Sequence, residues 1–117
     1  MESSETPKTV RARELQLRLE QGEAIQLVDV REDAELELAR LAHPVLHLPL
    51  SRSTEWVDRL GELLSHDRPI VVLCHAGVRS WQLGCWLIQA QGYGAVWNLQ
   101  GGIDSWSLEV DSSVPRY

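Results

Sequence analysis

The segment 74–80, Cys-His-Ala-Gly-Val-Arg-Ser, holds the residues of this chain best suited to chemistry. Cys74 ends the apolar run 68–74, a short loop with Gly77 follows, and a helical pattern begins at once. Loop N–H groups and a helix N-terminus that face a thiol stabilise the thiolate, which lowers the pKa and raises the nucleophilicity. We therefore predict that Cys74 is a nucleophile, that Gly77 takes a positive φ and that Arg79 adds a permanent cation.

Some residues of this loop are open to a second interpretation. A free cysteine in a strand is more often a packed core residue, but the strand-end position beside Gly77 and Arg79 favours the nucleophile. Arg79 either holds the oxyanion of a substrate, which we favour slightly, or pairs with an acid and braces the loop. His75 is more typical of a surface group than of a general acid or base.

The elements that must position this loop alternate between strand and helix. Helical spacing of apolar residues and terminal glycines or prolines predict helices, and β-branched runs predict strands. We expect helices over residues 10–21, 31–41, 53–65, 80–91 and 103–108, and strands or extended segments over 25–30, 46–50, 68–74 and 94–99. This order predicts an α/β fold with a central parallel sheet covered by helices on both faces.

Composition limits the class of protein. The chain has 117 residues, which is the size of one domain, and its 44% hydrophobic and 24% charged residues exclude a disordered chain. A net charge of −6 and a pI near 5.1 argue against nucleic acid or an anionic membrane as partner. With two cysteines and neither a signal peptide nor a spanning segment visible, we expect free thiols, the cytoplasm and a monomer.

We expect one domain, residues 9–108, between a flexible N-terminus, 1–8, and a loosely packed polar C-terminal tail, 109–117. Trp81 and Trp86 are expected to be core or near-core residues. Cys85 lies in an apolar helical pattern and is better explained as a core residue than as a resolving thiol. The histidines are too scattered among other residue types to predict a metal site.

Several segments, taken together and in order, resemble the single-domain rhodaneses, a family of sulfurtransferases, over about residues 10–106. The resemblance is carried by Leu27–Glu32, Leu48–Ser51, Cys74–Ser80, Gln91–Tyr93, Asn98–Ile103 and Trp106. The chain departs from the family at residues 40–45, Arg-Leu-Ala-His-Pro-Val, where many members have Gly-His-Ile-Pro-Gly-Ala. We therefore expect a differently shaped turn there, with no change at the nucleophile.

The resemblance implies a reaction in two steps without metal or cofactor. The Cys74 thiolate takes the outer sulfur of a small anionic donor such as thiosulfate, and an acceptor removes it from the resulting persulfide. The acceptor is cyanide or a thiol, on a small molecule or a protein. Backbone N–H groups of the loop would bind the terminal sulfur; the residues concerned are His75, Ala76, Gly77, Val78 and Ser80.

Two residues near the end of the predicted strand 25–30 also have expected roles, and the resemblance implies only that of Asp29. Asp29 would brace the active loop, with substrate contact as the second interpretation. Arg31 would help to form an anion-attracting rim, or would make a salt bridge at the surface.

Two other functions remain as alternatives. One is a cysteine phosphatase or arsenate reductase, which rhodanese-like folds also support. Cysteine phosphatases separate the cysteine and arginine by five residues, whereas four lie between Cys74 and Arg79, and the shorter ring suits one sulfur atom better than a phosphoryl group. The other is a non-enzymatic persulfide carrier or docking module, although inactive relatives generally lack the cysteine.

Overall fold

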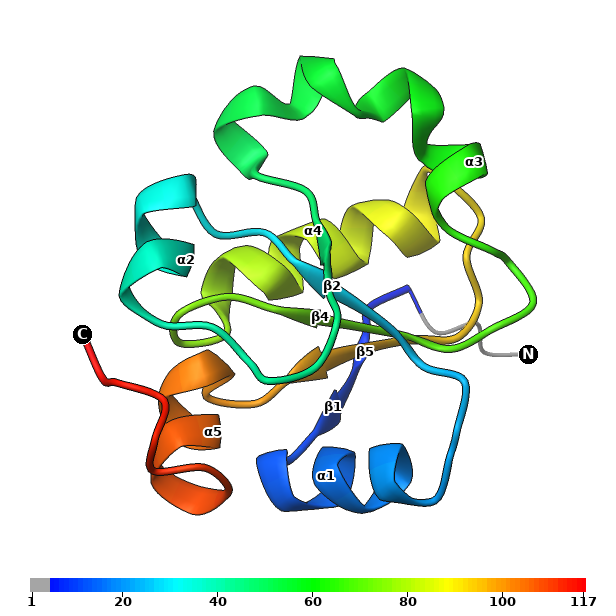
Figure 1. Cartoon of the computed structure of the whole chain (residues 1–117). Helices are drawn as coiled ribbons and strands as arrows, with labels where there is room; N and C mark the ends of the chain where they lie inside the picture. The colour runs from blue at the N-terminus through cyan, green and yellow to red at the C-terminus, as the bar shows by residue number, and fades with distance from the viewer. Residues whose placement is uncertain (1–4) are drawn as a thin grey trace.

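The computed structural model describes residues 5–117, which form a five-stranded parallel sheet flanked by helices (Figure 1). The strands are β1 (Lys8–Val10), β2 (Gln26–Asp29), β3 (Leu46–His47), β4 (Ile70–Leu73) and β5 (Val96–Leu99). The α-helices are α1 (Ala12–Glu20), α2 (Asp33–Leu38), α3 (Leu60–Leu63), α4 (Val78–Gln89) and α5 (Gly102–Glu109). The predicted α/β class with a central parallel sheet is confirmed.

The strand order is β1-β5-β4-β2-β3, and every neighbouring pair is parallel. Strand β4 is central, and all four of its residues are buried, which explains its uninterrupted Ile-Val-Val-Leu sequence. Parallel strands place their carboxyl ends at one edge of the sheet, so the residues after β2 and β4 become neighbours there.

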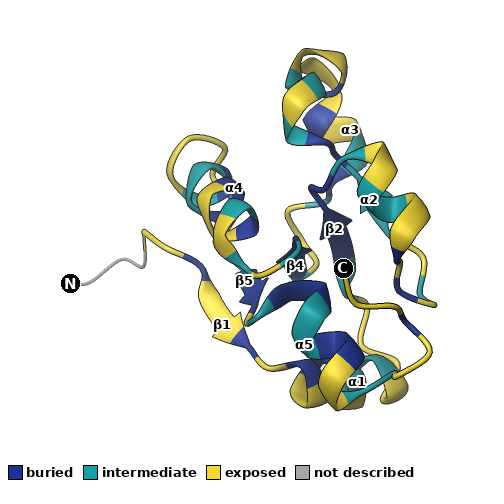
Figure 2. Cartoon of the chain, turned by 90° about the vertical axis from the view of Figure 1, so that its left-hand side faces the viewer, coloured by how far each residue is buried: buried dark blue, intermediate teal, exposed yellow. Residues whose placement is uncertain are grey.

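Two apolar clusters fill the two sides of the sheet. The strands between them, β2, β4 and β5, are mostly buried, whereas the edge strand β1 is mostly exposed (Figures 1 and 2). One cluster lies between the sheet and α4 and includes Trp56, Leu83 and Leu87. The other lies between the sheet and the pair α1 and α5, where Leu15, Ile103 and Trp106 are buried. Among residues 5–117, helices are too short or too polar to cross a bilayer.

The structure differs from the predicted elements at the first strand and in the segment 50–63. Residues 8–10 form the edge strand β1, which is too short, with two of its three side chains exposed, to leave a period-2 pattern. The helix predicted over 53–65 is instead two 3₁₀ segments, η1 (Leu50–Glu55) and η2 (Val57–Arg59), followed by α3. The break lies at Trp56, which has φ −125° and donates its indole N–H to Pro49 O at 3.0 Å.

Two other expectations are wrong. Trp81 is 43% exposed rather than part of the core, while Trp86 packs against the α4 cluster as expected. The C-terminal segment is not loosely packed throughout, because Val114 is buried beneath α5 and Tyr117 contacts the active loop. Residues 1–4 of the predicted N-terminal segment lie outside the described residues, and the domain boundaries remain a prediction.

Candidate active site

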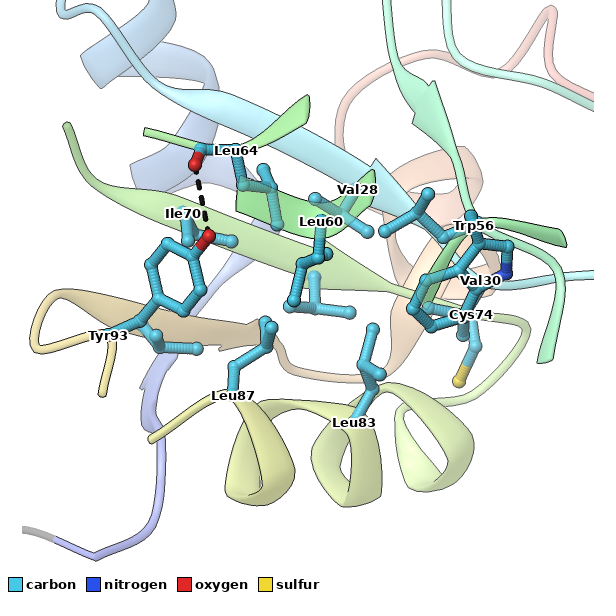
Figure 3. Close-up of a cluster of buried hydrophobic side chains, with 13 residues drawn as sticks. Val28, Val30, Trp56, Leu60, Leu64, Ile70, Cys74, Leu83, Leu87 and Tyr93 are labelled. Atoms are coloured by element: carbon cyan, nitrogen blue, oxygen red, sulfur yellow. Dashed lines mark hydrogen bonds between the residues drawn. The ribbon is translucent and has the colours of Figure 1, made fainter. Parts of the chain in front are cut away.

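Cys74 directly follows the central strand β4, and its side chain is buried at the end of the apolar cluster beside α4. Figure 3 shows its sulfur extending from the sheet toward the first turn of α4. The chain turns within residues 75–77 and enters the helix at Val78. The strand, the loop and the helix are contiguous in sequence, so the predicted arrangement around Cys74 forms as expected.

Hydrogen-bond donors from the loop and the helix converge on Cys74 Sγ. Gly77 N lies 3.1 Å from the sulfur, Ser80 N 3.4 Å and Ser80 Oγ 3.2 Å. Burial raises the pKa of the thiol, but hydrogen bonds from Ser80, Gly77 and Ala76 outweigh it, so the pKa lies below its ordinary value of 9.0. These donors, from Ala76, Gly77 and Ser80, form a cradle around the sulfur that is suited to an anion.

Asn98, at the end of β5, ties the two sides of this cradle together. Its Nδ2 donates to Gly77 O at 2.9 Å, and its Oδ1 accepts the Ser80 hydroxyl at 2.6 Å. Since the Ser80 hydroxyl has a single proton, it donates either to Asn98 or to Cys74 Sγ. A thiolate competes for that proton more strongly than a thiol does, because it is a charged acceptor.

Two glycines let backbones approach the site closely. Gly77 has φ +104°, which confirms the predicted positive φ, and its carbonyl is the one that Asn98 binds. Gly102 begins α5 against the active loop, where a Cβ would overlap the carbonyl oxygens of Cys74 and His75. The next two N–H groups of α5 instead donate to those carbonyls, Ile103 N to Cys74 O at 2.9 Å and Asp104 N to His75 O at 3.2 Å.

Arg79 extends from the first turn of α4 and forms a bidentate salt bridge with Glu35 of α2. Both N···O distances, from Nη1 to Oε2 and from Nη2 to Oε1, are 2.8 Å. The Arg79 hydrogen bonds hold the pKa of Glu35 down at about 2, aided by hydrogen bonds from Glu32 N and the Tyr117 hydroxyl. Arg79 was expected either to hold a substrate oxyanion or to pair with an acid, and the structure shows the pairing with an acid.

Arg31 and Asp29 form a second pair, entirely within the protein. Their side chains are 0% and 1% exposed, and Arg31 Nη2 lies 2.8 Å from Asp29 Oδ2. Arg31 Nε also donates to Asp29, and Nη1 donates to Glu35 O and to the Tyr117 hydroxyl. A guanidinium enclosed in this way does not form a solvent-facing rim, so the predictions of anion contact or a surface salt bridge for Arg31 are wrong. The Asp29 carboxylate accepts its hydrogen bonds from Arg31, so bracing of the active loop by Asp29 stays a prediction.

Tyr117 connects the two pairs and covers His75. Its hydroxyl accepts a hydrogen bond from Arg31 Nη1 and donates one to Glu35 Oε1, both at 3.1 Å. Its ring stacks on the His75 imidazole with 4.1 Å between centroids and 17° between planes. The C-terminal segment therefore forms part of the wall of the site, which no pattern in the sequence predicted.

Of the remaining predicted site residues, some contribute backbone groups that contact Cys74 and others lie at the protein surface. Backbone N–H groups of Ala76, Gly77 and Ser80 act on Cys74, whereas the Val78 side chain is 68% exposed at the start of α4. Cys85, farther along α4, is a free and partly buried thiol whose pKa is raised by burial. Glu35, Asn98 and Tyr117 complete the site, and sequence reasoning had not singled them out.

Comparison with known proteins agrees with this geometry. Residues 11–109 match the family described as Rhodanese-like domain. The chain belongs to the rhodanese-like domain family. A sulfurtransferase of Allochromatium vinosum is 39% identical over 93 residues, which is 80% of this chain and 81% of that protein.

Other relatives of this rhodanese-like domain are much longer than it is. The chloroplastic rhodanese-like/PpiC domain-containing protein 12 of Arabidopsis thaliana is 41% identical over 92 residues, or 79% of this chain but only 30% of the plant protein. Among solved structures, a rhodanese-like domain from an Anabaena species has a TM-score of 0.68 at 28% identity and covers 86% of this chain and 73% of its own. A rhodanese-like domain protein from Staphylococcus aureus has a TM-score of 0.71 and covers 94% of this chain and 98% of its own. At 22% identity it supports the fold alone.

Proposed function

We propose that this rhodanese-like domain is a sulfurtransferase that carries a sulfane sulfur on Cys74. The observation that supports it most directly is the set of donors around Cys74 Sγ, from Gly77 N, Ser80 N and Ser80 Oγ. These donors stabilise negative charge on sulfur, and a persulfide bears its negative charge on sulfur as well. The sulfurtransferase name of the Allochromatium relative supports the same class of reaction.

The first step loads the cysteine. The Cys74 thiolate attacks the outer sulfur of thiosulfate or a similar donor, a new S–S bond forms, and the donor's S–S bond breaks with loss of sulfite. Negative charge moves from Sγ to the terminal sulfur, where N–H groups of residues 75–80 stabilise it. Arg79 would attract the anionic donor, while Ala76 and Val78 would contribute backbone groups and His75 one wall of the entrance.

The second step removes the sulfur from the Cys74 persulfide. Cyanide or a thiolate attacks the terminal sulfur, which leaves as thiocyanate or as a new persulfide, and the Cys74 thiolate is regenerated. Neither step changes the overall charge or needs an external oxidant, since one S–S bond is exchanged for another bond to sulfur. We propose a small-molecule or protein thiol as acceptor. Cytoplasmic location and a monomeric state stay predictions.

Relatives with two named activities support the reaction class but leave the acceptor open. The adenylyltransferase and sulfurtransferase of Drosophila willistoni is 32% identical over 94 residues, which is 78% of this chain and 21% of that protein. In that relative the matching segment is one part of a longer protein that could supply or receive the sulfur. A persulfide carrier or docking module is therefore a second candidate. The two candidates differ in turnover, since a carrier loads sulfur without releasing it to small acceptors.

A kinetic assay separates these functions. We expect the protein to form thiocyanate from thiosulfate and cyanide in many turnovers, and Cys74→Ser to lose this activity. Cys85→Ser is the matched control and should keep it. The protein should not hydrolyse an aryl phosphate. Hydrolysis of the phosphate without thiocyanate formation would contradict the proposal, and loading of a single sulfur without turnover would favour the carrier.

A further inference from the structure

The salt bridge between Arg79 and Glu35 has a consequence for the choice of sulfur donor. Arg79 precedes Ser80, whose N–H and hydroxyl reach Cys74 Sγ, and its guanidinium interacts electrostatically with Cys74, so it is a suitable cation for an anionic donor. Its two terminal nitrogens are both bound by Glu35 at 2.8 Å. The same planar fork would be needed to hold the sulfonate oxygens of thiosulfate.

Glu35 is firmly held in this position. Besides Arg79, its carboxylate accepts Glu32 N at 2.9 Å as part of the capping box of α2, and the Tyr117 hydroxyl at 3.1 Å. Its side chain is 19% exposed, compared with 35% for Arg79. A dianionic donor that approaches Arg79 must therefore displace a fixed carboxylate or remain beside its negative charge.

Neighbouring arginines do not compensate, because they too are paired with carboxylates. Arg31 is enclosed with Asp29, and Arg116 binds Asp104, the residue that donates its N–H to His75 O. The net charge of −6 adds a weak repulsion of anions at longer range. The arginines around this loop therefore present little uncompensated positive charge to a small dianion.

We propose that Glu35 is a specificity-determining residue, which occupies the Arg79 fork and biases the site against dianionic sulfur donors relative to donors of lower charge. This inference rests on the proposed function, because it concerns the loading of sulfur onto Cys74. Thiosulfate, with two negative charges, meets the full effect of Glu35. A small alkyl persulfide carries at most one and delivers its outer sulfur in the same way, with an alkyl thiolate as leaving group.

The test compares loading of Cys74 by thiosulfate and by a small alkyl persulfide, followed as mass gain of the intact protein. The ratio of the two rate constants is the readout, because changes in thiolate reactivity or loop order affect both donors and cancel. Glu35→Gln retains a side chain able to form the capping box and removes the charge. We expect it to raise the ratio on the order of tenfold in favour of thiosulfate.

Glu37→Gln is the matched control, since Glu37 is exposed two residues farther along α2 and loses the same charge. It should leave the ratio within about twofold. The gain from Glu35→Gln should shrink when ionic strength rises from roughly 0.01 M to roughly 1 M, where the screening length falls to ~3 Å. In an Arg79→Gln background, Glu35→Gln should give a smaller gain, because the fork is already absent.

A ratio that falls or stays constant in Glu35→Gln would overturn the inference and show that Glu35 holds Arg79 in a pose that aids the donor. An equal rise in Glu37→Gln would also overturn it, since bulk charge would then explain the effect. Failure of the proposed function is distinguishable, because neither donor would then add sulfur to Cys74 in any variant. Thermal melts of each variant show whether the fold is kept.

Discussion

Two arginine–carboxylate pairs lie beside the active loop, and they differ in almost every physical respect. Arg31 and Asp29 are fully buried, two residues apart in sequence, at the end of β2. Arg79 and Glu35 are partly exposed, 44 residues apart, and join α4 to α2. A buried pair is costly to break because the remaining charge is left away from water, whereas each member of a partly exposed pair can be hydrated when its partner is removed. The first pair therefore suits bracing, and the second suits tuning of the site.

The largest expected effect comes from breaking the buried pair. Arg31→Met leaves the Asp29 carboxylate without its main partner inside the protein, which should lower the free energy of unfolding by about 3–5 kcal/mol. Chemical denaturation at pH 7 measures the change. Adding Asp29→Asn to Arg31→Met removes the stranded charge and should recover a good part of the loss. If the Arg31→Met variant were as stable as the wild type, the pair would not brace the fold.

Acid titration should weaken the exposed pair in a defined pH window. The pKa of Glu35 is lowered from 4.5 to about 2 by its hydrogen bonds, so its stabilising contribution is complete above about pH 4.5 and disappears as the pH falls toward 2. At neutral pH the contribution is on the order of 1–3 kcal/mol. The difference in unfolding free energy between wild type and Glu35→Gln, measured against pH, isolates it from other carboxylates. A difference that stays constant down to pH 2 would contradict this account.

Replacing Arg79 should affect turnover more than stability. Arg79→Lys keeps the charge but loses the planar fork, so both the Glu35 bridge and the grip on an anionic donor weaken. We expect a loss of about 1 kcal/mol or less in stability and about tenfold in turnover with thiosulfate. Parallel melts and initial rates provide the comparison. Unchanged turnover would mean that Arg79 only braces the loop.

A small effect, on stability alone, is expected from removing the hydroxyl that joins the two pairs. Tyr117→Phe keeps the ring stacked on His75 but removes the hydroxyl that bridges Arg31 and Glu35. The loss should be about 0.5–1.5 kcal/mol in unfolding free energy. In an Arg79→Lys background the effect should differ from that in the wild type, because Glu35 is shared by both contacts. Strict additivity would show that the pairs are independent.

The comparison also explains how much of the site the sequence could predict. Cys74, Gly77 and Ser80 were predictable because strand, loop and helix are contiguous, so local pattern fixes their arrangement. Glu35 and Tyr117 come from α2 and the C-terminal segment, and no local pattern shows which acid or aromatic ring reaches the loop. Arg31 was misplaced because arginine is seldom fully buried, and its side chain is bound from α2 and the C-terminal segment, by Glu35 O and the Tyr117 hydroxyl, which local sequence does not reveal.

In the fold, the buried central strands were predictable for the same reason that the active loop was. Strand β4 has a continuous apolar run, and two of the flanking helices end near a glycine, α1 before Gly22 with φ +79° and α4 before Gly92 with φ +75°. The structure of segment 50–63 was not predictable in this way. Its apolar residues have helical spacing, but the backbone of Trp56 is not helical and its indole N–H binds Pro49 O. A hydrogen bond formed by one side chain in the folded protein leaves no signal in the periodicity.

The central claim is that the cradle of the active loop makes Cys74 the residue that carries sulfur. A single-turnover experiment tests it most directly: the protein is incubated with thiosulfate or a small alkyl persulfide, and its intact mass is measured before and after cyanide is added. We expect a gain of one sulfur atom, located on the peptide that contains Cys74, lost again with cyanide, absent in Cys74→Ser and retained in Cys85→Ser. A sulfur atom found on Cys85, or no gain with either donor, would contradict the claim.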